Sequence, residues 1–408
     1  MFKNKRLLLV YLIVLVDVIA GSAIWPAFPA FVSGLEKPQI WLAIGTALFL
    51  GIQLSTAPLL GKLSDNVGRK PVFIISAIGT FFSLLLLSPI KAWSYFANRT
   101  ADGFTNGVYA AVRSAVTDIS DEKDIMENVG MEGTIVAVGF VIGPMLAGLL
   151  LSVTNATGEA ATFSLICMGL IVSAINVVLC LFFKETLKNK TSLTSSEVLK
   201  QMREALDITQ LWNKLLLKDK ASPGLLKVVI LQLFLTLSLG YYSYFITYLS
   251  FGALHLSVRD ISYFFIYFGT LSIFTYYFFY TYIVNKIHHQ SFIICMAVMG
   301  IATHVAYANT GTSLLAMYVI VTLDTITISL LPGVLDGLVA QFSEDEDRGE
   351  LFGITQALNG VASLATTVVF GVVSVWSLEM PFYWFAICLV PLVVLRISKE
   401  KIKRSNTN

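Results

Sequence analysis

Charged residues are scarce in this chain. Only 13% of its 408 residues are Asp, Glu, Lys or Arg, whereas 56% are hydrophobic and the mean hydropathy is +0.75. A water-soluble body of this size needs many more charges to cover its surface. The composition therefore excludes an ordinary soluble globular protein and indicates a protein that lies in a lipid bilayer.

Cysteine is also rare, and phosphate-binding loops are absent. The four cysteines lie singly in apolar stretches, without the spacing of a zinc site or a disulfide framework. No GxxxxGK[ST] motif is present, and the polar segments are too short for a nucleotide-binding domain. We therefore expect no metal, no cofactor, no ATP-driven step and no enzymatic activity. The small net charge of +2 gives no reason to expect nucleic acid as a partner.

Long apolar runs fill most of the chain. About 20 apolar residues in a helix cross the roughly 30 Å of hydrocarbon in a bilayer. Windows of that length predict twelve spans, near residues 6–33, 40–60, 71–90, 93–117, 128–151, 160–183, 226–252, 259–283, 290–309, 312–340, 350–375 and 380–397. We therefore expect an all-α membrane protein with twelve transmembrane helices, and we interpret the N-terminal apolar run as the first span rather than a signal peptide.

The positive charges are strongly segregated. Of the 28 Lys and Arg residues, 24 lie in the termini, or in or beside the turns after spans 2, 4, 6, 8 and 10. Lys37, Lys91 and Arg259 lie in turns on the other side, and Arg99 lies within a span. Because positive residues are retained in the cytoplasm, we predict a multi-pass protein of the inner (plasma) membrane with both termini cytoplasmic.

The longest polar piece, 184–225, divides the chain into a six-span half at 1–183 and another at 226–408. Within it, a capping box of Thr194 and Glu197 and apolar residues at helical spacing predict a short amphipathic helix on the membrane surface, which we interpret as a tether rather than a regulatory element. A shift of about 220 residues places 61–70 over 281–290, although the chemistry of the turn is lost. Duplicated six-span halves with a substrate path between them are typical of secondary transporters.

The turn GKLSDNVGRK at 61–70 is unusually rich in charge for its apolar surroundings. An acid, a glycine and two basic residues in a short turn can brace the cytoplasmic ends of two helices. The turn resembles the signature between spans 2 and 3 of the major facilitator superfamily at Gly61, Leu63, Asp65, Gly68, Arg69 and Lys70. The resemblance implies that Asp65 acts as a conformational latch that contacts Arg113 and the Arg348–Gly349 turn. The alternative is a solvated positive-inside loop.

Span 4 contains the segment NRTADGFTNGVYAA, which places Arg99, Gly103 and Gly107 on one face of a helix. A buried Arg in a membrane is costly, so it must face water or a carboxylate. The pattern resembles the Arg motif of proton-coupled members of the superfamily, which implies a part in proton handling. This chain also carries Asp102 close by, and two interpretations stay open: the acid neutralises Arg99, or it takes part in coupling.

Span 5 contains the segment GFVIGPMLAG, with Gly139, Gly143, Pro144 and Gly148 at helical intervals. Small residues allow a neighbouring helix to approach closely, and proline removes one backbone hydrogen bond. The segment resembles the antiporter motif of drug exporters. The alternative is a generic packing kink, since membrane helices often carry Gly and Pro.

Span 1 places Asp17 in an apolar helix before Pro26 and Pro29. An acid within a membrane span is a functional candidate, because the hydrocarbon disfavours its charged form. The segment resembles the first helix of tetracycline exporters and related drug:proton antiporters, which implies that Asp17 carries the proton. The alternative is a packing residue that is held by hydrogen bonds.

The second half is less informative. Asp324 lies within span 10, and two interpretations stay open. It is a second proton-coupling or substrate-facing acid, or it is a structural hydrogen-bond partner. We interpret His304 as a packed histidine, and we expect Asp118, Glu132 and Asp336 to be solvated. Spans 7 and 8 are rich in aromatic residues, and those that face inward are predicted to stack on a flat hydrophobic substrate. The candidates are Tyr241, Tyr244, Phe245 and Tyr248.

These observations predict a monomeric transporter that exports a hydrophobic or amphipathic small molecule in exchange for protons, by rocking of two halves. A proton-coupled importer of a sugar or other nutrient would use the same frame. A receptor or scaffold without transport is the third possibility, although it has no reason to carry costly charges within its spans.

Overall fold

The computed structural model describes residues 4–121, 124–187, 207–283, 288–327, 330–341 and 348–395 of the protein. These residues are mainly helical and contain no strand. Helices overlap each of the twelve predicted spans, and nine helical stretches in the described ranges are long and apolar enough to cross a membrane. The predicted all-α membrane fold is confirmed.

The described residues form two compact units. Unit 1 contains those within 1–206 and 246–269, and unit 2 contains those within 207–245 and 270–408. The sequence predicts a division at 184–225 instead, which stays a prediction. The two divisions differ over 246–269, which packs with the N-terminal residues.

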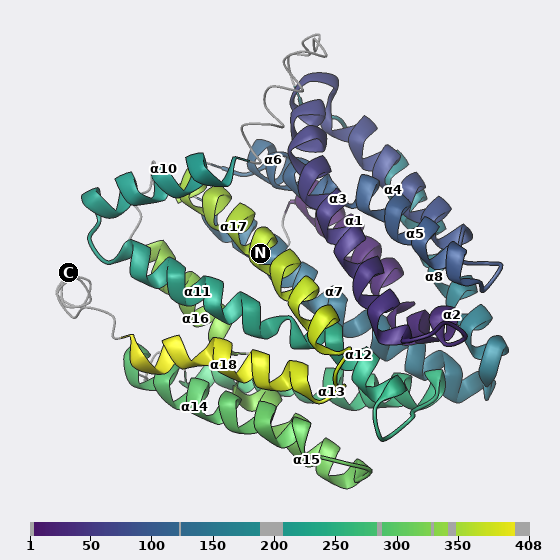
Figure 1. Ribbon diagram of the computed structural model, residues 1–408. Coiled ribbons are helices and arrows are strands. Elements are labelled where there is room, and N and C mark those ends of the chain that lie inside the picture. The colour runs from purple at the N-terminus through teal and green to yellow at the C-terminus, as the bar shows by residue number, and fades with distance from the viewer. Residues whose placement is uncertain are drawn as a thin grey trace. The chain divides into compact units, whose positions relative to one another are not determined.

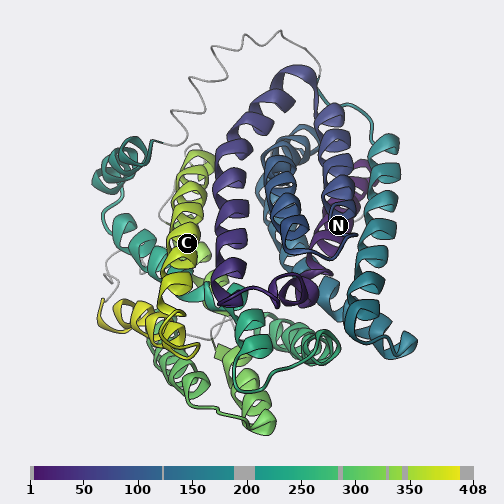
Figure 2. The ribbon, with the colours of Figure 1, turned by 45° about the vertical axis from the view of Figure 1, so that its right-hand side comes forward.

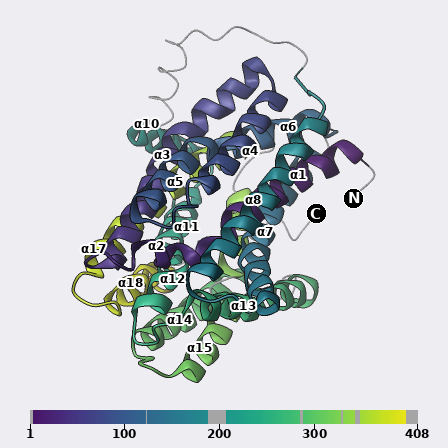
Figure 3. The same ribbon diagram turned by 90° about the vertical axis from the view of Figure 1, so that its right-hand side faces the viewer.

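Unit 1 is built mainly from the first eight α-helices. They are α1 (Lys5–Ser22), α2 (Phe28–Val32), α3 (Pro38–Val67), α4 (Arg69–Leu85), α5 (Ala92–Thr105), α6 (Tyr109–Ile119), α7 (Ile125–Thr154) and α8 (Gly158–Phe182). Helix α1 packs against both α7 and α8 (Figure 3). Helix α3, the long indigo ribbon in Figure 2, packs along α5. This arrangement makes α1 a central element of the unit.

Proline and glycine set the ends of these helices. Helix α1 ends at Ser22, and a short 3-10 helix with Pro26 precedes α2, where Pro29 lies in the first turn. Proline has no backbone N–H, so it fits the first turn of a helix. Gly68 separates α3 from α4 with a φ of 121°. Residues other than glycine rarely adopt this backbone conformation.

Unit 2 contains the remaining helices, two of which cross into unit 1. They are α10 (Ile208–Ala221), α11 (Leu225–Leu239), α12 (Tyr241–Phe251), α13 (Val258–Phe278), α14 (His289–Ala308), α15 (Leu314–Thr327), α16 (Leu331–Gln341), α17 (Arg348–Val373) and α18 (Met380–Val394). Within this unit α11 packs on α17 and α18, and α14 packs on α18 (Figure 1). Helices α12 and α13 each begin in one unit and end in the other.

Helix α10 lies in the polar segment between the predicted halves. Asp207 caps its N-terminus by accepting a hydrogen bond from the backbone N–H of Gln210 at 3.0 Å. Lys218 and Lys220 lie in its last turn, where positive charge suits the helix dipole. The predicted capping box of Thr194 and Glu197 lies outside the described residues. Part of the turn at 281–290 that was compared with 61–70 also lies outside them.

Candidate functional site

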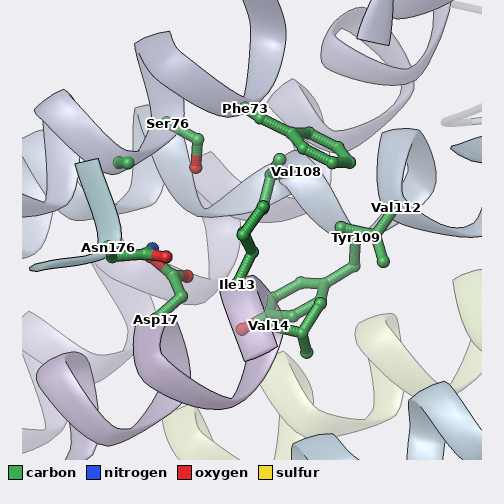
Figure 4. Close-up of a pocket in the computed structure, with 10 residues that line it drawn as sticks. Ile13, Val14, Asp17, Phe73, Ser76, Val108, Tyr109, Val112 and Asn176 are labelled. Atoms are coloured by element: carbon green, nitrogen blue, oxygen red, sulfur yellow. The ribbon is translucent and has the colours of Figure 1, made fainter. Parts of the chain in front are cut away.

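Asp17 lies in the second half of α1 and is buried, with 7% of its surface exposed. Its Oδ1 accepts a hydrogen bond from Asn176 Nδ2 of α8 at 3.0 Å and another from Thr80 Oγ1 of α4 at 3.4 Å. Asp17 and Asn176 meet at one side of a small pocket (Figure 4). Three helices of unit 1 therefore hold this carboxyl group in place.

The pocket beside Asp17 has a volume of about 10 Å³. Its polar lining comes from Asp17, Ser76, Tyr109 and Asn176, and the rest of the lining is apolar. A site of that volume is about as large as a single water molecule requires. The pocket thus suits an acid that exchanges a proton, and it is far too small for a drug-sized substrate.

Arg99 on α5 is buried and paired within its own helix. Its guanidinium donates to Asn98 Oδ1 at 2.7 and 2.9 Å and lies 3.4 Å from Asp102 Oδ2. The rings of Phe28 and Phe49 lie 4.3 and 5.1 Å from the guanidinium carbon. These contacts compensate the cost of burying a cation. A role of Arg99 and Asp102 in proton coupling stays a prediction.

The predicted latch forms a charge cluster at the start of α4. Arg69 is buried and forms ion pairs with Asp65 and, at 3.1 Å, with Asp118. Arg69 Nη1 also donates to Ser64 Oγ at 3.0 Å. The turn at Gly68 therefore places Asp65, at the end of α3, against Arg69, the first residue of α4. Lys70 donates to the backbone oxygen of Leu181 at 2.7 Å, and Gly61 accepts from Ser64 through its backbone oxygen.

One expectation about the charged residues here is corrected. Arg113 pairs with Glu132 at 3.3 Å, and its contact with Asp65 stays a prediction of the family resemblance. Glu132 was expected to be solvated, yet only 2% of its surface is exposed. Burial follows from its position on the inner face of α7, where Arg113 supplies the opposite charge that a buried carboxylate requires. The side chains of the Arg348–Gly349 turn lie outside what the structure describes.

Glu185 is a partner of the latch that the sequence reasoning missed. Its carboxylate accepts the backbone N–H groups of Arg69 at 2.9 Å and Lys70 at 3.3 Å, at the N-terminus of α4. A Cβ atom at Gly68 would collide with the Glu185 carboxylate. One feature of the sequence could have indicated this partner. Glu185 directly follows span 6, on the side where the 61–70 turn is predicted, and an acid favours a helix N-terminus.

The Glu185 interaction predicts a pH dependence of stability. Burial alone would raise the pKa of this carboxyl group, but backbone N–H groups of Leu187, Arg69, Lys70 and Thr186 outweigh it and lower the pKa. The stabilisation by Glu185 is therefore full above the normal pKa of glutamate and is lost as the pH falls through the lower pKa of the folded state. We expect wild type to melt above Glu185→Gln at neutral pH, with the difference vanishing in acid. A difference in melting temperature that persists unchanged at low pH would contradict this.

The latch itself is tested by Asp65→Asn. We expect a sharp loss of transport with little change in expression or melting temperature, because Arg69 keeps Asp118 and Ser64 as partners. Transport rate and thermal stability are measured on the same preparation. Asp121→Asn, which neutralises an exposed acid beyond α6, is the control. Transport by Asp65→Asn at the wild-type rate would remove the latch role.

The glycines of the predicted antiporter motif lie at tight helix contacts within unit 1. A Cβ atom at Gly139 would lie 2.8 Å from Val18, and one at Gly143 would meet the Ser22 hydroxyl and lie 3.0 Å from the backbone oxygen of Ile19. Both contacts are with α1. Pro144 lies inside α7, which continues to Thr154.

Gly148, one turn further along, faces another helix. A Cβ atom there would meet the backbone oxygen of Ser262 and lie 2.7 Å from Ile266, both on α13. Gly269 of α13 similarly faces Val141 of α7. The small residues thus let α7 approach α1 at one level and α13 at another.

The predicted substrate-binding aromatic residues are buried. Tyr241, Tyr244 and Tyr248 each have at most 2% of their surface exposed, and Phe245 has 6%. The hydroxyl of Tyr244 donates to the backbone oxygen of Leu378 at 2.7 Å, and that of Tyr241 donates to Asp324. Both hydroxyls therefore have intramolecular partners in unit 2, while Tyr248 belongs to unit 1. Substrate binding by these residues stays a prediction.

Comparison with known proteins identifies the family. The model of the Major Facilitator Superfamily matches residues 10–290. The chain belongs to the Major Facilitator Superfamily. This family consists of membrane transporters rather than enzymes, as the absence of nucleotide or metal motifs in the sequence had suggested.

Several relatives and solved structures refine this assignment. The chain is 30% identical over 191 residues to the class H tetracycline resistance protein of Pasteurella multocida, and 26% identical over 199 residues to the class B protein of Escherichia coli. These matches cover 46% and 48% of both chains, so the chain spans about half the length of the curated relatives it matches.

Among solved structures, the human organic anion transporter MFSD10 (TETRAN) aligns with a TM-score of 0.64 at 17% identity, covering 96% of this chain and 99% of the other. A D-xylose-proton symporter aligns with a TM-score of 0.67 at 14% identity and 97% coverage of both. At such low identity the likeness shows the fold alone.

Proposed function

We propose that this transporter exports a hydrophobic or amphipathic small molecule in exchange for protons. The observation that carries the proposal is Asp17, a buried carboxyl group beside a pocket of about 10 Å³. A carboxylate in hydrocarbon is costly, so it favours the neutral form when sealed and releases its proton when water reaches it. That exchange is what a proton-coupled transporter requires of one residue.

The direction of transport is supported by two further features. The glycines of α7 resemble the antiporter motif, and they lie at tight contacts with α1, the helix that carries Asp17. The class H and class B relatives bear the name of tetracycline resistance proteins. We therefore propose a tetracycline-like compound as the first substrate to test. In this proposal the termini are cytoplasmic and the membrane is the inner one.

Coupling requires that protons and substrate favour different states of the protein. A ligand shifts a conformational equilibrium only by its difference in affinity between the two states. In this scheme the substrate binds to the conformation in which Asp17 is ionised, and proton binding to Asp17 favours the opposite conformation. One cycle then moves substrate in one direction and a proton in the other. Two further candidates for this proton-coupling step are Arg99 and Asp102. Both lie on α5, which packs on α3.

The proposal is tested with purified protein in liposomes that have an acidic interior. Antiport predicts that external tetracycline accumulates inside while the interior becomes less acidic. Symport predicts accumulation only when the gradient is reversed, and a receptor or scaffold predicts no flux under either gradient. A panel of hydrophobic drugs and sugars, run in both gradients, separates these three cases and identifies the substrate class.

A further inference from the structure

Another cavity of unit 1 lies where α1 begins and α8 ends. Its volume is about 220 Å³, and the residues that line it are Lys5, Arg6, Leu9, Phe182, Phe183 and Lys184. The two helices pack against each other (Figure 3), and each belongs to a stretch that is long and apolar enough to cross a membrane. Because it lies at the ends of two such stretches, the cavity is at the boundary of the bilayer, on the side that the charge distribution predicts to be cytoplasmic.

Three cations and no acid line this cavity. The side chains of Lys5, Arg6 and Lys184 are exposed, and none of them forms an ion pair within the part of the chain that the structure describes. Lys70, which also lies near the end of α8, differs because its ammonium group donates to the backbone oxygen of Leu181 at 2.7 Å. The lining therefore offers three positive charges to an anion that comes from outside the protein.

Two of these cations occupy an unfavourable place in their own helix. Lys5 and Arg6 are the first two residues of α1, and the first turn of this helix contains no acid. The positive end of the helix dipole lies there, so negative charge is favoured and positive charge is disfavoured. An anion in the cavity would offset this repulsion in addition to pairing with the side chains.

The backbone on both sides of the cavity is held in place. Asn4 caps α1 by accepting a hydrogen bond from the backbone N–H of Arg6 at 3.1 Å. On the other side, Glu185 directly follows Lys184, and its carboxylate accepts two backbone N–H groups at the start of α4. A site whose backbone is already ordered loses little conformational freedom when a ligand binds.

The rest of the lining is apolar and lies toward the interior of the bilayer. Leu9 lies one turn along α1 from Lys5, on the same face of the helix. Phe183 is buried against Phe73, with ring centroids 4.9 Å apart, whereas 71% of the surface of Phe182 is exposed. The cavity thus joins a positively charged end to an apolar end, as a ligand with an anionic head and a hydrocarbon chain requires.

We propose that this cavity binds the headgroup of an anionic phospholipid. Lys5, Arg6 and Lys184 contact its phosphate, and the first part of an acyl chain lies against Leu9 and Phe182. The cavity is smaller than the roughly 300 Å³ at which drug-sized sites begin, so a headgroup suits it better than a whole drug. A zwitterionic lipid suits it less, because its ammonium group would meet three cations. This lipid site is independent of the transported substrate and of the direction of transport.

The test measures lipid binding and needs no transported substrate. Native mass spectrometry of the purified protein counts the molecules of phosphatidylglycerol or phosphatidylcholine, with the same acyl chains, that stay bound. We expect wild type to retain one phosphatidylglycerol molecule more tightly than phosphatidylcholine. Lys184→Gln should weaken that binding about fivefold, and Lys5→Gln combined with Arg6→Gln about 30-fold. Equal retention of the two lipids by wild type would overturn the proposal.

Two controls separate the cavity from general charge and general apolar surface. Lys220→Gln removes an exposed cation from the last turn of α10 and should leave phosphatidylglycerol binding unchanged. Phe182→Ala should weaken the binding without a change of charge, whereas Phe163→Ala, which removes an exposed ring near the other end of α8, should not. All of these side chains are exposed, so the variants are expected to fold. Equal losses in Lys184→Gln and Lys220→Gln would show that total charge alone matters, and the site would be disproved.

The melting temperature distinguishes a lipid from a soluble anion, because a ligand that binds the folded protein raises it. Phosphatidylglycerol should raise the melting temperature of detergent-purified wild type and have less effect on Lys184→Gln. Inorganic phosphate should give the same melting temperature as sodium chloride of equal ionic strength. Specific stabilisation of wild type by inorganic phosphate, lost in Lys184→Gln, would assign the cavity to a soluble phosphate and reject the lipid. None of these outcomes depends on whether tetracycline is transported.

Discussion

Asp17→Asn is expected to fold and to lose uphill export that is driven by a pH gradient. Asparagine keeps the shape of the side chain, and its oxygen can still accept from Thr80 and Asn176. It cannot bind and release a proton. Accumulation of tetracycline, or of the substrate that the panel identifies, in inside-out vesicles should fall to the level of vesicles without the protein. Substrate binding should also lose its pH dependence, and Arg99→Ala should give a similar but less complete defect.

The matched control for Asp17 is Asp260→Asn. Asp260 is an exposed acid that pairs with Ser257 in the first turn of α13, so its neutralisation changes charge without touching the pocket. Export by this variant should stay near the wild-type rate. If Asp17→Asn accumulates substrate at the wild-type rate, the coupling acid lies elsewhere, and Asp102 is the next residue to replace.

Gly143→Leu is expected to abolish export. Even the first carbon of a side chain would meet Ser22, and it would lie 3.0 Å from the backbone oxygen of Ile19 and 3.1 Å from the backbone nitrogen of Ala23. Backbone atoms cannot turn aside as a side chain can, so α7 and α1 must separate. Overpacking of this kind costs about 1–3 kcal/mol of stability. It also displaces the helix that carries Asp17, and the loss of gradient-driven export is therefore expected to exceed the loss of stability.

Gly133 provides the control on the same helix. A Cβ atom at Gly133 would meet nothing within 4 Å, so Gly133→Leu adds the same apolar volume without a collision. Export and melting temperature are measured for both variants, with Gly143→Ala as an intermediate step. If Gly143→Leu exports normally, the close contact of α7 with α1 is not needed for transport, and the resemblance of GFVIGPMLAG to an antiporter motif carries no weight.

The sequence located the buried charged residues because charge is so rare in the spans. Asp17, Arg99 and Asp324 stand out in apolar runs, and the structure buries all three. Their partners could not be found in the same way. Thr80 and Asn176 lie 63 and 159 residues from Asp17, and single polar residues of that kind occur in many spans for reasons of packing.

The charge cluster of the latch shows the limit of resemblance. The turn at 61–70 was recognised from its residues, but the resemblance gave no indication of two ion-pair and capping partners that the structure shows near it. Arg113 contacts Glu132, and Glu185 from beyond span 6 caps α4. Both partners depend on which helices pack together, and a turn motif carries no information about that.

Hydrophobic length and charge distribution determined that the chain is an all-α membrane protein, because a bilayer fixes both the length of a span and the cost of a charge within it. Only the tertiary structure decided which hydroxyl and amide groups face Asp17 and Asp324, and which tyrosine hydroxyls are used internally. Hydrogen bonds require donors within about 3 Å. Helix packing brings such groups together from distant positions, and the periodicity of a single helix does not specify which ones meet.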